Sequence, residues 1–200
     1  AQGMQSGKPV ESIQTNLIGS INILESSHDV DFVLGVSSDK AVQVSGTYGA
    51  TKFLMEQLFN QFEKKNKSVK YRVVRLGNVI YSTDSVLFKW KKLIQECKEV
   101  IVTSYEATRF YMTAEESVQT ILNCLKKSTD SKPYFEYTKS TSIKDLLIAM
   151  INKYSPNNCK SPVKVIGLQS SENLHEKISR SGPYTNEVEN YTIKELEKMI

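Results

Sequence analysis

Residues 36–52, VSSDKAVQVSGTYGATK, decide how this chain can fold and where its chemistry can lie. They begin at the end of a short apolar run over 30–36, VDFVLGV, which is typical of a parallel strand covered on both faces. Two hydroxyls, a carboxylate and an amine follow at once, in residues 37–40. Because open α/β sheets bind their ligands at the carboxyl ends of strands, we expect a site at this point of the chain.

Tyr48 and Lys52 stand four residues apart at the start of a predicted helix over 48–65, so their side chains share one face. A nearby ammonium favours phenolate over phenol, which predicts a tyrosine pKa below the usual ~10. Such a phenolate can take a proton from a substrate hydroxyl. Gly46 and Gly49 flank Tyr48 and allow the backbone to be approached closely. Taken alone, the pair also fits an exposed helix face, and Asp39 with Lys40 also fits a solvated turn.

The rest of the chain alternates predicted strands with amphipathic helices, which indicates an α/β fold with a parallel sheet. We expect apolar helix faces of Leu54, Leu58 and Phe62 in the second helix, and of Val118, Ile121, Leu122 and Leu125 in the fourth. Thr113 and Glu116 predict a capping box. The expected helices cover 10–27, 48–65, 85–96, 113–127, 142–154, 174–180 and 192–200, and the expected strands cover 30–36, 71–76, 100–103, 134–138 and 163–166.

Composition narrows the function classes. The 200 residues carry a net charge of only +4 without a basic stripe, so nucleic-acid binding is not favoured. No apolar run has the length of a membrane span, and no leader-like segment opens the chain, so we expect no membrane partner. Three widely spaced cysteines, Cys97, Cys124 and Cys159, argue against a disulfide framework or a zinc site and for a cytoplasmic location. With two histidines, no metal centre is expected.

Four segments together resemble one known family, the UDP-N-acetylglucosamine 4,6-dehydratases of the extended short-chain dehydrogenase/reductase superfamily, which act in surface-polysaccharide biosynthesis. The resemblance runs from about Pro9 to the C-terminus. It is carried by TNLIGSINILE (15–25), by SSDKAVQVSGTYGATKFLMEQLF (37–59), by RLGNVIYSTDSVLFKWKKLI (75–94) with ATRFYMTAEESVQTIL (107–122), and by VKVIGLQSSENLHEKI (163–178).

The resemblance implies an NAD(P)-dependent lyase that converts a UDP-sugar into a 4-keto-6-deoxy sugar. Tyr48 and Lys52 would oxidise the sugar at C4, and Ser38 would orient the substrate. Asp39 and Lys40 would be the acid and the base that remove water across C5 and C6. The new C4 ketone acidifies the C5 hydrogen, and hydride finally returns to C6.

Binding roles follow from the same matched positions. Ser37, with Tyr48 and Lys52, would contact the NAD or NADP cofactor. Asn78, Arg109 and Glu172 would contact the UDP-sugar, and the arginine fork suits a diphosphate. The resemblance also implies homo-oligomers.

The family's glycine-rich phosphate turn has no counterpart in this sequence. We therefore expect an α/β fold that is the C-terminal half of a Rossmann-like parallel sheet, with a small substrate-binding subdomain. Residues 9–80 and 113–140 would form the partial core, 81–112 and 141–200 the sugar-nucleotide subdomain, and 1–8 a disordered start or an expression remnant. The first strand would present an open edge, which favours a homo-oligomer or a separate N-terminal half.

Two further departures keep other functions open. The family's Gly-Ser-Arg-Gly-Ser is Tyr81-Ser-Thr-Asp-Ser85 here, and its Arg-Pro-Gly-Glu-Lys is Gln169-Ser-Ser-Glu-Asn173. The chain could thus be a catalytically silent member that acts as a binding or structural protein. It could also be a related nucleotide-sugar epimerase or reductase. The sequence leaves open which UDP-sugar is bound, the stereochemistry at C5, and NAD against NADP.

Overall fold

The computed structural model describes residues 8–83, 85–157 and 159–200. The predicted disordered start, 1–8, lies almost wholly outside these residues. At the centre, β1 (Phe32–Ser38) and β2 (Lys70–Leu76) run parallel, from the pair Phe32↔Lys70 to the pair Ser38↔Leu76. Within the described residues no strand pairs with the other edge of β1, as predicted. The predicted strand over 134–138 is reduced to a single parallel bridge between Val74 and Tyr134.

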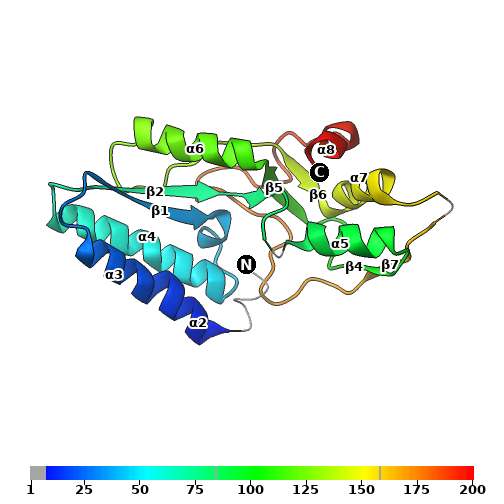
Figure 1. Ribbon diagram of the computed structural model, residues 1–200, viewed down its shortest axis with the longest axis horizontal. Coiled ribbons are helices and arrows are strands. Elements are labelled where there is room, and N and C mark those ends of the chain that lie inside the picture. Colours follow the sequence, from blue (N-terminus) through cyan, green and yellow to red (C-terminus); the bar gives the residue numbers. More distant parts are fainter. Residues whose placement is uncertain (1–7, 84, 158) are drawn as a thin grey trace.

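Helices cover both faces of this two-stranded layer (Figure 1). On one face lie α4 (Thr47–Lys65) and a continuous helix made of α2 (Pro9–Ile13), the π-helical turn η1 (Gln14–Ile18) and α3 (Gly19–Ser26). On the other face lies α6 (Ala114–Lys127). The helices predicted over 10–27, 48–65 and 113–127 are thus confirmed.

The buried face of α4 agrees with the predicted one only in part, because Leu58 and Phe62 pack against the core at its margin but Leu54 does not. Met55 and Phe59 pack into the core with Tyr71 of β2, whereas Leu54 is 46% exposed. The reason lies at the start of the helix, where a side chain on Gly49 would meet the Lys40 carbonyl oxygen at 2.3 Å. This close approach fixes the rotation of α4, and leucine spacing alone could not reveal it.

The capping box at the start of α6 is confirmed, since Thr113 Oγ1 accepts from Glu116 N and Glu116 Oε2 accepts from Thr113 N. The predicted apolar face is right only in part, because Ile121 and Leu125 are half-buried but Val118 is 54% exposed and Leu122 is exposed as well. Small side chains face the sheet instead, namely Ser117, Thr120 and Cys124. They let the helix pack closely on β2, where Cys124 Sγ lies 3.6 Å from the Val73 carbonyl oxygen.

The remaining elements build a second part of the molecule beyond the carboxyl ends of β1 and β2 (Figure 1). In a three-stranded sheet, β3 (Asn78–Val79) and β5 (Thr108–Met112) are parallel, and β5 and β6 (Ser140–Ser142) are antiparallel. In a separate pair, β4 (Val100–Val102) runs parallel to β7 (Val163–Val165). The short strands β3, β5 and β6 were not predicted. The helices of this second part are α5 (Val86–Gln95), α7 (Ile143–Tyr154) and α8 (Ile193–Met199).

The segment 174–180, predicted as a helix, is an irregular loop held against β5. Thr108 N donates to Leu174 O at 3.0 Å, and Glu176 N donates to the Thr185 hydroxyl at 2.9 Å. Lys177 and Tyr184 form an antiparallel bridge. Because these backbone groups bond to other segments, they are not available for helical hydrogen bonds.

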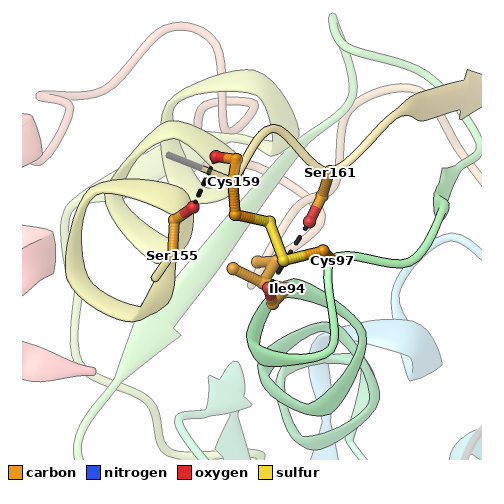
Figure 2. Close-up of a disulfide and its surroundings, with 5 residues drawn as sticks. All are labelled: Ile94, Cys97, Ser155, Cys159 and Ser161. Carbon is orange, nitrogen blue, oxygen red and sulfur yellow. Dashed lines mark hydrogen bonds between the residues drawn. A yellow bond between two sulfur atoms is a disulfide. The ribbon is translucent and has the colours of Figure 1, made fainter. Parts of the chain in front are cut away.

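Cys97 and Cys159 form a disulfide, which corrects the expectation of free thiols (Figure 2). They are 62 residues apart in sequence, but the packing of α5 against α7 brings their Cα atoms within 5.9 Å. Cys124 is free and buried. Because disulfides are rare in reducing compartments, the prediction of a cytoplasmic location loses its support from the cysteines. No helix in the described part of the chain is long and apolar enough to cross a membrane.

Candidate active site

A cavity of about 470 Å³ opens where β1 and β2 end and the second part of the molecule begins. Its walls come from the end of β1, the turn after β2, the start of α5, and β5. The predicted site residues that line it are Ser37, Ser38, Lys40, Tyr48, Asn78, Arg109 and Glu172. The fold therefore gathers residues from five separate segments at the edge of the sheet that the sequence indicated.

Tyr48 and Lys52 lie at the start of α4 and face the same way, as predicted. The Lys52 ammonium is 5.9 Å from the centre of the Tyr48 ring and donates to the Val36 carbonyl oxygen at 2.9 Å. Gly49 allows this end of the helix to rest directly on the backbone of Lys40. The phenol is thereby held beside the turn that carries Asp39 and Lys40.

The pKa of Tyr48 is raised, which corrects the expectation that Lys52 would lower it. Burial raises it first and the Asp39 carboxylate adds to this, against the opposing effects of Lys40 and of a hydrogen bond with Ser38. The pKa of Lys52 is lowered by burial. In this arrangement Tyr48 is therefore a neutral phenol that can donate a hydrogen bond into the cavity.

Asp39 and Lys40 form a buried ion pair at the tip of β1. Lys40 Nζ lies 3.0 Å from both carboxylate oxygens of Asp39 and 2.5 Å from Glu176 Oε2. The other oxygen of Glu176 lies 3.2 Å from Arg109 Nε. All four side chains are at least nine-tenths buried, and their two positive and two negative charges balance. Buried charges in proteins need such partners.

The protonation states in this network follow from burial and pairing. Burial opposes the charged form of Lys40, but Asp39 and Glu176 outweigh it and raise the lysine pKa. Burial also opposes the Asp39 carboxylate, but Lys40 together with hydrogen bonds from Glu176 and Ser38 outweighs it and lowers the pKa. For Glu176 burial prevails, and the pKa rises to about 7. Lys40 is thus an ammonium and Asp39 a carboxylate, the reverse of the base and acid roles that the resemblance implies.

The side chains of the other predicted residues form hydrogen bonds with neighbouring protein groups. Ser38 Oγ donates to Asp39 Oδ1 at 2.6 Å, and Ser37 Oγ donates to Glu56 Oε1 at 2.6 Å. Asn78 Nδ2 donates to the carbonyl oxygen of Phe110 at 3.0 Å. These bonds fix the walls of the cavity before any ligand enters.

Glu172 and Arg109 are likewise positioned by backbone contacts. Glu172 Oε2 accepts from the backbone amide of Gln169 at 3.1 Å. Arg109 Nη1 donates to the carbonyl oxygens of Thr108 and Leu174, at 2.8 and 3.1 Å. The arginine therefore reaches the cavity with its orientation already set.

Two contacts at the edge of the site are seen only in the structure, although Asn16 matches an asparagine near the active site in the family pattern. Glu176 lies in a segment that matched the family pattern, yet only the fold shows that it meets Lys40, 136 residues away. Asn16 lies in the π-helical turn, and its Nδ2 donates to Thr51 Oγ1 at 3.0 Å, which in turn donates to the Tyr48 carbonyl. π-helical turns often occur at functional sites.

Comparison with known proteins identifies the family. A family model described as polysaccharide biosynthesis protein matches residues 4–197. An uncharacterized membrane protein of Methanocaldococcus jannaschii is 33% identical, over 96% of this chain and 58% of its own. The UDP-N-acetylglucosamine 4,6-dehydratase (inverting) of Campylobacter jejuni is also 33% identical, over 92% of this chain and 55% of its own. The chain thus spans little more than half the length of these relatives.

The structure of Pen from Bacillus thuringiensis has a TM-score of 0.81 and 27% identity, covering 88% of this chain and 56% of that one. This likeness confirms the predicted Rossmann-like α/β fold class. The family match and the 33% identity agree with the resemblance seen in the four sequence segments. The chain therefore belongs to the polysaccharide biosynthesis protein family, which confirms its resemblance to UDP-N-acetylglucosamine 4,6-dehydratases.

Proposed function

We propose that this chain carries the elimination site of an NAD(P)-dependent nucleotide-sugar 4,6-dehydratase in polysaccharide biosynthesis, with UDP-N-acetylglucosamine as the substrate. The observation that supports it best is the buried Asp39–Lys40 pair beside Tyr48 at one edge of the cavity. A C4 epimerase needs the tyrosine, but it has no step that requires an additional acid and base. The Campylobacter jejuni relative that bears this activity in its name supports the choice.

The reaction assigns each of these side chains a proton or an orientation. Once Tyr48 has lost its own proton, it takes the proton of the C4 hydroxyl as the sugar is oxidised to a 4-ketone, and Ser38 orients that hydroxyl. Lys40, as a neutral amine, removes the C5 proton, and Asp39, as a carboxylic acid, protonates the departing C6 hydroxyl, so that one water leaves. A proton must therefore leave Lys40 and one must reach Asp39 before this step. Reduction at C6 and protonation at C5 then give the 4-keto-6-deoxy sugar.

The substrate's diphosphate meets Arg109, whose guanidinium lines the cavity. Asn78 and Glu172 line the same cavity and suit the hydroxyl and amide groups of a UDP-sugar. Tyr48 and Lys52, at the carboxyl end of β1, suit the ribose hydroxyls of a dinucleotide, and Ser37 lies beside them. When bound, the nicotinamide would supply the hydride acceptor and donor, and the positive charge of its oxidised form would favour loss of the Tyr48 proton.

The test is product analysis with the protein that carries this chain in its complete reading frame. UDP-N-acetylglucosamine and NAD or NADP are supplied, and the product is identified by NMR. We expect a 4-keto-6-deoxy sugar from the unaltered protein and none from Asp39→Asn or Lys40→Met. A C4-epimerised sugar would show the epimerase alternative. A folded protein that binds UDP-sugar without any turnover would show the silent alternative.

A further inference from the structure

We propose that Glu176 is the positioning residue of this site, which fixes Lys40 and Arg109 in one unit and exchanges a proton with Lys40. The inference rests on the proposed function and adds a residue to it. Glu176 reaches the cavity edge from the C-terminal segment, whereas Lys40 follows β1 and Arg109 lies on β5. One carboxylate therefore joins the elimination pair to the phosphate-binding arginine.

The geometry of the carboxylate supports a positioning role. Its two oxygens serve different partners, Lys40 Nζ at 2.5 Å and Arg109 Nε at 3.2 Å. The residue itself is held by its backbone, because Glu176 N donates to Thr185 Oγ1 and Thr185 N donates to Glu176 O, both at 2.9 Å. Thr185 is in turn bonded to Thr108 of β5 through its hydroxyl, at 2.6 Å. The carboxylate is thus fixed to the same strand that carries Arg109.

The protonation states explain why such a residue is needed. The ammonium form of Lys40 cannot accept the C5 proton, because a base must first be free of its own proton. Glu176 is the carboxylate in short contact with Lys40 that is not its neighbour in sequence. Transfer of one proton from Lys40 Nζ to Glu176 Oε2 leaves a neutral amine and a neutral carboxylic acid. Burial favours such a neutral pair over two separate charges.

The surroundings of Glu176 set how readily it holds a proton. Burial raises its pKa to about 7, Asp39 adds to this, and Lys40 and Arg109 oppose it. Tyr111 of β5 also interacts electrostatically with the carboxylate. The neighbouring His175 is turned away to Thr108, at 2.8 Å between Nδ1 and Oγ1. A carboxylate with a pKa near neutrality can both lose and regain a proton during turnover.

The first arm of the test needs no activity. The protein is labelled with [13Cε]lysine, and the Lys40 signal, assigned by its loss in Lys40→Met, is followed from pH 5.5 to 8.5. In the unaltered protein we expect an inflection near pH 7 from Glu176, and no such inflection in Glu176→Gln. Glu63→Gln is the control, because Glu63 also pairs with an arginine, Arg72 at 3.2 Å, but lies about 22 Å along α4 from Tyr48.

The second arm uses turnover. In Glu176→Gln we expect kcat to fall roughly tenfold or more, with loss of the rise in kcat between pH 6 and 8, and weaker binding of UDP through Arg109. Glu176→Asp, which keeps the charge, should recover part of kcat and the pH dependence. Glu63→Gln should match the unaltered protein.

The outcomes separate this inference from the proposed function. An unchanged Lys40 inflection in Glu176→Gln, or unchanged kcat, UDP affinity and pH profile, would overturn the role of Glu176 and leave the dehydratase intact. If no variant forms product but the Lys40 signal depends on Glu176, the proposed reaction fails while the coupling of the two groups stands.

Discussion

Replacing Lys40 by Met should destabilise the protein much more at pH 8 than at pH 5.5. The substitution keeps most of the side-chain volume and removes the ammonium that lies between Asp39 and Glu176, at 3.0 and 2.5 Å. Both carboxylates remain buried, with Arg109 as the cation bound to Glu176. The cost then depends on whether Glu176 can become neutral by taking a proton.

The magnitude follows from the difference between the folded and unfolded pKa of Glu176. Folding raises it from 4.5 to about 7, so the folded state binds this proton more tightly and stability falls as the pH rises from about 4.5 through 7. At about 1.4 kcal/mol per pH unit, the unaltered protein loses at most about 3 kcal/mol over this range. Without the ammonium, the folded pKa of Glu176 rises further, and the loss of stability continues above pH 7.

At pH 5.5 Glu176 is protonated, and Lys40→Met costs the lost hydrogen bonds, about 1–3 kcal/mol. At pH 8 it leaves a buried charge without its partner, which costs about 3–5 kcal/mol. Urea unfolding can follow the fluorescence of the single tryptophan, Trp90, which is buried in the core. Glu195, whose pKa is lowered to about 2, titrates below this window. In Lys40→Met, Asp39 also loses the ammonium that lowers its pKa, so burial raises the pKa of this carboxyl too and adds to the cost at pH 8. An equal loss of stability at both pH values would refute the reasoning.

Three further predictions concern packing, capping and the disulfide. Gly49→Ala should reduce turnover and thermal stability together, because the new Cβ would stand 2.3 Å from the Lys40 carbonyl oxygen and push α4 away from the turn that carries Asp39 and Lys40. Gly19→Ala is the matched control for both measurements, because its Cβ would lie 3.6 Å from its nearest neighbour, the Gln14 carbonyl oxygen. Thr113→Ala should lower the free energy of unfolding by about 1 kcal/mol, measured in urea, whereas Thr113→Ser should be nearly neutral. Removal of the Cys97–Cys159 disulfide, whose cysteines are 62 residues apart, should lower the free energy of unfolding by up to about 4 kcal/mol. A thiol assay of the denatured protein should find one free thiol per chain, and three free thiols would contradict the disulfide.

Much of the candidate site could be read from the sequence because its parts are local. Tyr48 and Lys52 share a helix face by spacing, and the polar residues that follow an apolar strand must lie at its carboxyl end. The structure brings Ser38 and Lys40 to the same cavity as Tyr48. Their roles in catalysis and binding remain predictions.

What the sequence could not show depends on contacts between distant segments. Glu176 meets Lys40 across 136 residues, and neither local spacing nor composition identifies that pair. The same limit explains the disulfide, which depends on how α5 packs against α7. The expected pKa of Tyr48 was wrong because burial and Asp39, which prevail in the structure, are properties of the folded site.

The predicted apolar faces of α4 and α6 were only partly right, for a related reason. Apolar spacing indicates a stripe, but close packing selects which stripe is buried. Gly49 turns Met55 and Phe59 of α4 inward, and the small residues of α6 face the sheet while Val118 and Leu122 are exposed. Gly49, next to Tyr48, was the signal that could have corrected the orientation of α4.

One measurement tests the elimination site most directly. The protein in its complete reading frame is incubated with UDP-N-acetylglucosamine and nicotinamide cofactor in D2O, and the product is examined by NMR. We predict a 4-keto-6-deoxy sugar with deuterium at C5, formed by the unaltered protein and absent with Lys40→Met or Tyr48→Phe. A product inverted at C4 with hydrogen retained at C5, or equal turnover by Lys40→Met, would contradict the elimination chemistry assigned to this cavity.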